Sequence, residues 1–150
     1  MAKLQLPQDF KEFLKLLNAN SVEYLVIGGY AVGAHGYVRA TNDLDIWVKM
    51  SQENAERMVR TLREFGFGVS GLNPELFLDP KSLVRLGVPP LRVEILTSVS
   101  AVEFDACYAE RELVTIEELP IPVMSLACLR ANKAGAGRVK DLADLDNLPK

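Results

Sequence analysis

The stretch Asp43-Leu-Asp-Ile-Trp-Val constrains this chain more than any other feature of its sequence. Polar and apolar residues alternate in it, which is typical of a β-strand, so Asp43 and Asp45 share one face and the apolar residues between them share the other. Two carboxylates on one face repel each other unless a cation lies between them. A fold that contains this strand must therefore bury its apolar face and supply the aspartates with a counter-charge.

A glycine turn precedes the two aspartates. The apolar run from Tyr24 to Ile27 ends at Gly28-Gly29, a pattern that predicts a strand buried on both faces and then a short helix over residues 30–35. Glycine lets a ligand approach the backbone closely, and the free amides at a helix start favour an anion. The torsion angles of a tight turn would explain the two glycines equally well. Tyr30 excludes a dinucleotide-binding fingerprint, and no P-loop sequence follows.

The remaining periodicities predict an α/β fold of the α+β type. It has a small mixed, partly antiparallel sheet, with helices packed mainly on one face. We expect a single domain over residues 1–150 because no linker or repeat interrupts the pattern. The predicted helical segments are 10–20, 30–35, 51–66, 75–78, 100–109, 125–134 and 138–145, and the predicted strands are 24–27, 43–48, 83–86, 91–96, 113–116 and 121–123, the last two as an edge ribbon.

Composition limits the chemistry and the compartment. With 17 basic and 20 acidic residues the net charge is −3, which disfavours sequence-independent duplex binding. One histidine, His35, is too few for a zinc site, so any metal must be held by oxygen. We expect Cys107 and Cys128 to be reduced core residues. No segment has the length of a membrane span or the pattern of a signal peptide, so we expect a cytoplasmic protein.

Magnesium is the natural partner for the carboxylates of Asp43 and Asp45. A hard divalent cation keeps both groups ionised and prefers carboxylate oxygens. The alternative is a solvated strand end whose acids pair with Arg39 or another nearby base. Leu44 and Ile46 favour the metal site, because burial of their face fixes both aspartates on a rigid element at the rim of the sheet.

These motifs resemble the DNA polymerase beta-like nucleotidyltransferase superfamily, whose hallmark is a glycine pair after an apolar residue, then acid, apolar, acid, apolar. The chain is similar to minimal bacterial members of that superfamily, including the AbiEii group of toxin-antitoxin modules. The resemblance rests on Ile27-Gly28-Gly29-Tyr30-Ala31, His35-Gly36, Arg39-Ala40-Thr41, Asp43-Leu44-Asp45-Ile46, Asn132-Lys133 and Gly137-Arg138-Val139-Lys140-Asp141.

The resemblance implies three acidic metal ligands, and Glu94 between Val93 and Ile95 matches the third. The superfamily more often has Asp there, and a strand glutamate could instead pair with Arg85 or Arg92. Two Mg²⁺ ions on these acids would activate a hydroxyl and stabilise pyrophosphate as it leaves. The implied catalytic and metal-binding residues are Asp43, Asp45 and Glu94, and the implied nucleotide-binding residues are Gly28, Gly29, Arg39, Thr41, Lys133 and Arg138.

For Lys133 the resemblance implies contact with the triphosphate, with Arg138 and Asp141 on the same wall. Local pairing is the alternative for this region, with Arg138 bound to Asp141 and Lys140 to Asp144 along one helix.

The predicted function is Mg²⁺-dependent transfer of a nucleoside monophosphate from an NTP to a hydroxyl on tRNA, a protein or a small molecule. A homodimer or a toxin-antitoxin partner would fit so short a chain. Two alternatives remain: a catalytically silent relative that acts as an antitoxin or regulatory binding subunit, and a Mg²⁺-dependent phosphatase. The phosphatase would leave the glycine turn unexplained.

Overall fold

A six-stranded mixed sheet forms the centre of the molecule, in a computed structural model that describes residues 6–39, 41–87 and 92–150. The strand order is β3-β4-β2-β1-β6-β5. Neighbouring strands are antiparallel except for β2 with β4 and β1 with β6. The strands are β1 (Tyr24–Ile27), β2 (Asp43–Val48), β3 (Leu83–Leu86), β4 (Arg92–Leu96), β5 (Glu112–Ile116) and β6 (Leu119–Val123), and the mixed α+β architecture predicted from the sequence is confirmed.

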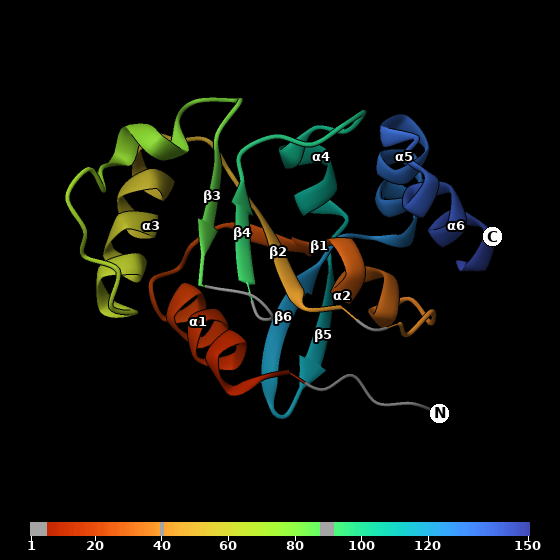
Figure 1. The fold of residues 1–150 in the computed structure, drawn as a ribbon, viewed down its shortest axis with the longest axis horizontal. Coiled ribbons are helices and arrows are strands. Elements are labelled where there is room, and N and C mark those ends of the chain that lie inside the picture. The colour runs from red at the N-terminus through yellow and green to blue at the C-terminus, as the bar shows by residue number, and fades with distance from the viewer. Residues whose placement is uncertain (1–5, 40, 88–91) are drawn as a thin grey trace.

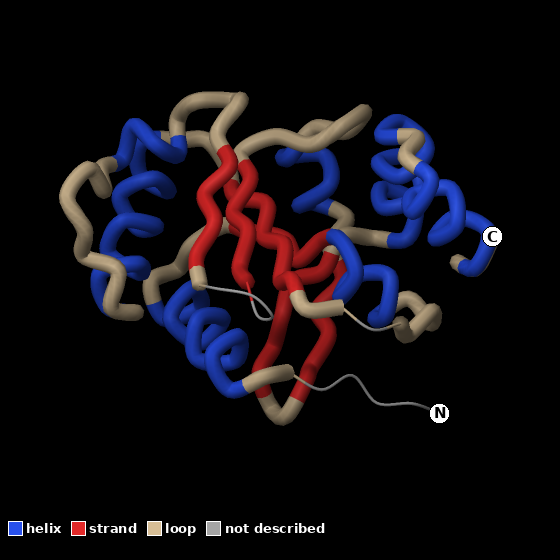
Figure 2. The backbone as a smooth tube through the Cα atoms, viewed as in Figure 1, coloured by secondary structure: helices blue, strands red, loops and turns tan. Residues whose placement is uncertain are grey.

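Helices lie on both sides of the sheet in the view of Figures 1 and 2. The two longest helices, α1 and α3, pack against each other and cover the face that carries Leu44 and Ile46. On the opposite face, the ring of Phe104 in α4 meets Trp47 edge-on, with ring centroids 5.1 Å apart. The helices are α1 (Gln8–Ala19), α2 (Gly28–Ala34), α3 (Gln52–Glu64), α4 (Phe104–Ala109), α5 (Leu126–Ala136) and α6 (Val139–Asn147), with a 3₁₀ turn η1 at Pro74–Phe77.

The central strands are buried as the sequence predicts. All four residues of β1 are buried, and in β2 Leu44, Ile46 and Val48 are fully enclosed. Trp47 is also buried, and its indole N–H donates to the carbonyl of Thr97, so this ring packs in the core and is not available to stack on a base. Both cysteines are buried and free, as expected. None of the described helices is both long and apolar enough to span a membrane.

Two predicted helices differ from the structure for local reasons. The helix predicted over 100–109 begins only at Phe104, because Ala101 has a φ of 70° and cannot continue a right-handed helix. Conversely, Gly135 does not interrupt α5. A β-carbon on Gly135 would lie 2.4 Å from that of Ala101, so this glycine allows the helix to approach the 98–101 segment.

The prediction of an edge ribbon is correct for one of its two strands. β5 is the edge strand, but β6 lies between β5 and β1. Its prolines are tolerated because the pairing with β1 is confined to Val123, beyond both Pro120 and Pro122. The turn predicted at 87–90 falls mainly on residues 88–90, which lie outside the described residues, as does Leu91 at the start of the predicted fourth strand.

Asn54 at the start of α3 links three backbone segments. Its side chain is 1% exposed, accepts a hydrogen bond from the amide of Glu23 and donates to the carbonyls of Glu23 and Lys49. It therefore fixes the entry of β1 to the exit of β2. Ser51 caps the same helix through the amide of Asn54.

We expect Asn54→Ala to lower the free energy of unfolding by about 2–4 kcal/mol, because the amide of Glu23 and the carbonyl of Lys49 lose their side-chain partner, whereas the carbonyl of Glu23 keeps the amide of Lys49. The matched control is Gln52→Ala at an exposed position of the same turn, which should change it by less than about 0.5 kcal/mol. Urea unfolding followed by circular dichroism measures both. Equal midpoints for the two variants would contradict this role for Asn54.

Candidate active site

One polar cavity gathers all the predicted catalytic and nucleotide-binding residues. Its volume is about 440 Å³, and it opens beside the glycine turn. The sheet contributes the three acidic side chains, and Arg39 and helices α5 and α6 contribute the basic ones. The lining residues are Ile27, Gly28, Gly29, Arg39, Thr41, Asp43, Asp45, Glu94, Leu96, Ser98, Val99, Ser100, Asn132, Lys133, Ala136, Arg138 and Lys140.

The sheet register explains why the acids meet. Asp45 is paired with Glu94 in the parallel ladder between β2 and β4, and with Ile27 in the antiparallel ladder between β1 and β2. Partners in adjacent strands project from the same face, so Glu94 lies beside Asp45, and the turn after Ile27 lies on its other side. Asp43 lies on the same face, two residues before Asp45.

Gly28 leaves the space that the carboxylate of Asp45 occupies. Its φ is 68°, a conformation that favours glycine, and a β-carbon there would lie 2.1 Å from Oδ2 of Asp45. Gly29 similarly leaves room for Thr41, whose Oγ1 would be 2.9 Å from an added β-carbon. Thr41 in turn accepts a hydrogen bond from the amide of Asp43 at 3.4 Å. Gly28 is therefore needed for its backbone torsion and for close approach, and Gly29 for close approach.

Asp45 lacks the partner that a buried carboxylate normally has. Its Oδ1 is buried without any hydrogen bond. Burial raises the pKa of Asp45 to about 7, with further contributions from the charge of Glu94, a hydrogen bond with it and the charge of Asp43, while Lys140 acts in the opposite direction. Because Asp45 lines the polar cavity, a cation bound there could supply the counter-charge that this carboxylate lacks.

The other two acids already have arginine partners. Nε of Arg85 donates to Oε1 of Glu94 at 3.1 Å, and Nε of Arg92 donates to Oδ1 of Asp43 at 3.3 Å. As they stand, no three His, Cys, Asp or Glu side chains among the described residues are arranged to hold a metal. The side chain of Arg85 is 58% exposed, however, and so exposed a pair contributes only about 0.2–1 kcal/mol. A divalent cation can compete with it for Glu94.

Lys133 lines the cavity and contacts two aspartates. Its ammonium group lies 3.1 Å from Asp141 and 3.1 Å from Asp144, and its side chain is 5% exposed. The predicted pair of Arg138 with Asp141 is present. Asp144 does not pair with Lys140, because Arg39 and Lys133 occupy its carboxylate.

Sequence reasoning missed the wall formed by Ser98, Val99 and Ser100, which follows β4 and faces α5. Its only signal is its position at the end of the strand that carries Glu94. Asn132 on α5 donates a hydrogen bond to the carbonyl of Ser100 at 3.0 Å and so joins the two sides. His35 does not line the cavity: its Nε2 lies 2.7 Å from the carbonyl oxygen of Met124, a contact that gives the ring a structural role.

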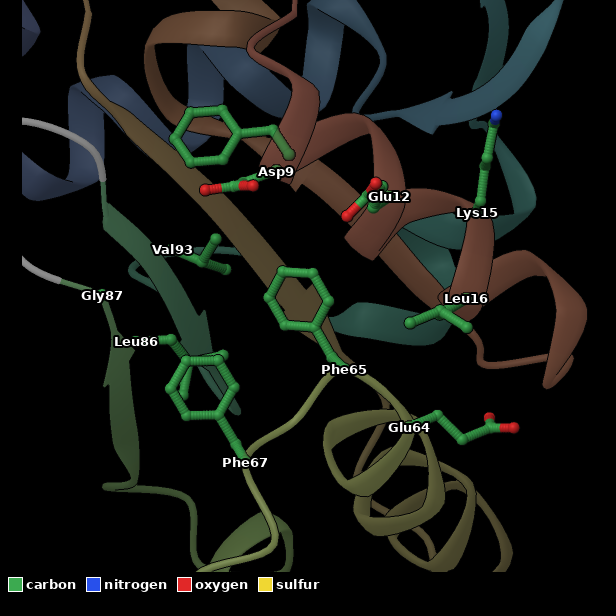
Figure 3. Close-up of a pocket in the computed structure, with 11 residues that line it drawn as sticks. Asp9, Glu12, Lys15, Leu16, Glu64, Phe65, Phe67, Leu86, Gly87 and Val93 are labelled. Atoms are coloured by element: carbon green, nitrogen blue, oxygen red, sulfur yellow. The ribbon is translucent and has the colours of Figure 1, made fainter.

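A second cavity, of about 590 Å³, lies on the opposite face of the sheet between α1, the segment after α3 and strands β3 and β4 (Figure 3). Val93 faces this cavity, whereas its neighbour Glu94 faces the polar one. The larger cavity has an apolar floor that includes Phe65 and Phe67, and it contains none of the predicted catalytic residues. Cavity size therefore does not identify the site.

Comparison with known proteins agrees with this geometry. The family model for aminoglycoside-2''-adenylyltransferases matches residues 9–148. The chain belongs to this family. As a member of the aminoglycoside-2''-adenylyltransferase family it is a nucleotidyltransferase and an enzyme, as predicted. The narrower resemblance to the AbiEii group stays a prediction.

A solved structure from Thermotoga maritima, described as a "putative nucleotidyltransferase", has the same fold as this adenylyltransferase-family chain. The TM-score is 0.61 at 20% sequence identity, and the match covers 92% of this chain and 88% of the other. No curated protein sequence matches the chain significantly.

The raised pKa of Asp45 predicts a pH-dependent stability. Because the folded state holds this proton more tightly than the unfolded state, stability should fall as the pH rises from about 4 through 7. We expect Asp45→Asn to melt about 3 °C or more above the wild type at pH 8 without divalent cations, and the difference to shrink at pH 5. Differential scanning calorimetry with EDTA measures this. The same gain at both pH values would show that Asp45 is not a strained carboxylate.

Proposed function

We propose that this protein transfers a nucleoside monophosphate from an NTP to a hydroxyl acceptor and releases pyrophosphate, with Mg²⁺ as the cofactor. The observation that carries the proposal is the buried, unpartnered Oδ1 of Asp45 beside Asp43 and Glu94. These oxygens are the donor type that Mg²⁺ prefers, and the added charge would relieve the repulsion between the carboxylates. We propose Asp43 and Asp45 as the first metal ligands, with Glu94 completing the set after release from Arg85.

The reaction has a simple balance of bonds. The acceptor oxygen forms a bond to the α-phosphorus, the bond from that phosphorus to the oxygen bridging to the β-phosphate breaks, and the hydroxyl proton passes to solvent. Bound Mg²⁺ would lower the pKa of the hydroxyl and neutralise charge on the departing pyrophosphate. The chain's own part is to position the groups: the acids fix the ions, and Arg39 and Arg138 offer charged donors to phosphate oxygens.

The backbone at the glycine turn supports a position for the phosphates in the polar cavity. Gly28 and Gly29 line the same cavity as the acids and bring unshielded backbone to its wall. Backbone amides at such a turn suit phosphate oxygens. Thr41, which lies against Gly29, would hold the register between this turn and Asp43.

The family name specifies transfer of AMP to the 2''-hydroxyl of aminoglycosides, so we propose ATP and an amino-sugar hydroxyl as the first donor and acceptor to test. tRNA and protein hydroxyls are the other acceptors. A homodimer, a toxin-antitoxin partner, a single domain and a cytoplasmic location remain predictions. Family membership favours the enzyme over the catalytically silent alternative.

The decisive experiment incubates the protein with each α-labelled NTP, Mg²⁺ and three acceptor pools: kanamycin and tobramycin, total tRNA, and protein. We expect label transfer in one pool, and a loss of at least about 100-fold with Asp45→Asn, because the metal site loses its buried carboxylate. Asp146→Asn, an exposed site, is the control with the same change. If Asp45→Asn retained wild-type turnover, the assigned chemistry would be wrong.

Gly28→Ala should separate close approach from backbone torsion. The added methyl group would displace the carboxylate of Asp45, so we expect turnover to fall at least about tenfold while the protein stays folded. Gly36→Ala is the matched control: Gly36 also has a positive φ, 112°, but an added β-carbon there would meet no atom within 4 Å. Similar activity losses in both variants would mean that backbone strain, and not the position of Asp45, causes the effect.

A further inference from the structure

Helix α6 buries two of its aspartates and exposes two of its apolar side chains. Asp141 and Asp144 are 0% and 2% exposed, whereas Val139 and Leu142 are 87% and 50% exposed. This is the reverse of the usual pattern for a helix that packs on a globular domain. Buried carboxylates are costly unless they are paired, so the partners of these two aspartates determine what the inner face of α6 does.

Asp144 makes a bidentate pair with a residue that is distant in sequence. Its Oδ1 accepts from Nε of Arg39 at 2.9 Å and its Oδ2 from Nη2 of Arg39 at 3.0 Å, across 105 positions of sequence. Its Oδ2 also lies 3.1 Å from the ammonium group of Lys133. Burial alone would raise the pKa of Asp144, but the hydrogen bonds from Arg39 and Lys133 outweigh it and hold the pKa below its usual value. The carboxylate is therefore charged.

Asp141 completes an alternating chain of charges. It accepts from Lys133 at 3.1 Å and from Nε of Arg138 at 2.7 Å. The contacts run from Arg39 to Asp144, then to Lys133, Asp141 and Arg138. Three cations therefore share two buried anions. The three cations all line the polar cavity.

Arg39 and Arg138, at the two ends of this series of ion pairs, are more exposed than Lys133 in its middle. Lys133 has its side chain 5% exposed and directs two of its three N–H donors to aspartates. The side chains of Arg39 and Arg138 are 28% and 64% exposed. Each of these arginines pairs through Nε and Nη2, and its Nη1 takes no part in the pair. Planar guanidinium groups held on one edge present the other edge in a fixed direction.

We propose that Asp144 is a positioning residue that aims the guanidinium group of Arg39 at the phosphates of the bound nucleotide. The inference rests on the proposed function, since it assumes that the phosphates lie in the polar cavity. Lys133 then serves as the shared counter-ion between Asp141 and Asp144, which allows both carboxylates to remain charged in a buried place. Without Asp144, Arg39 would keep its charge but lose its orientation.

The experiment compares Asp144→Asn, Arg39→Lys, the double variant and the control Asp146→Asn, all as full-length protein. The Asp144→Asn change preserves the shape of the side chain but leaves an uncharged amide that binds the guanidinium group weakly, and lysine cannot form the bidentate pair. We expect each single variant to raise KM for the Mg²⁺–NTP complex about tenfold and to change kcat less than about threefold. Because Asp144 acts through Arg39, the double variant should be no worse than either single one. Asp146→Asn should behave as the wild type.

Several results would overturn the inference: an unchanged KM in Asp144→Asn, a roughly 100-fold increase in the double variant, or a fall in kcat that matches only a loss of folded protein. If Asp144→Asn fails to fold, Arg39→Lys still tests the idea, because a normal KM in that variant contradicts it. Titration with a fluorescent methylanthraniloyl-ATP separates the two proposals. If the wild type transfers no label, the proposed reaction fails. The inference then stands or falls on whether the two single variants weaken nucleotide binding.

Discussion

The whole site depends on the burial of one carboxylate, that of Asp45, between a glycine turn and a second acid. The register of three strands produces this arrangement, because Ile27, Asp45 and Glu94 form one row across β1, β2 and β4. Slipping either ladder by one residue would turn Asp45 toward α1 and α3 and expose Leu44. The apolar face of β2 therefore fixes the position of the acids as firmly as it fixes the fold.

Two separate charge systems face each other across the polar cavity. The acids lie on the sheet, whose strands are held by regular ladders and an apolar core. The bases lie mainly on α5 and α6, and Asp144 of α6 pairs with Arg39, which precedes β2. In a bidentate, nearly buried pair the loss of one partner is far more costly than in an exposed one. The width of the cavity thus depends on an ion pair and not only on apolar packing.

Local patterns in the sequence were enough to identify the acids and the glycine turn. Alternation in 43–48 and the short apolar run before Gly28 carry that information within a few residues. Glu94 could be identified from its apolar neighbours, and Arg85 and Arg92 were both possible partners. Only the register of the hairpin, which places Arg85 opposite Glu94, decides between them. The same limit applies to Asp144, whose local spacing favours Lys140 while the fold supplies Arg39 from the other end of the chain.

The unusual backbone at Ala101 and the glycine at position 135 could not be explained from local sequence either, because each depends on contact with the other segment. Ala101 adopts a positive φ beside Gly135, and the helical pattern of either segment alone gives no sign of the other. Together these two residues bring the 98–101 segment against α5, where both elements line the cavity. The residues proposed for the chemistry are thus visible in local sequence, whereas those that set the geometry of the cavity are visible only in the fold. For this reason the positioning role falls to an aspartate that no motif singles out.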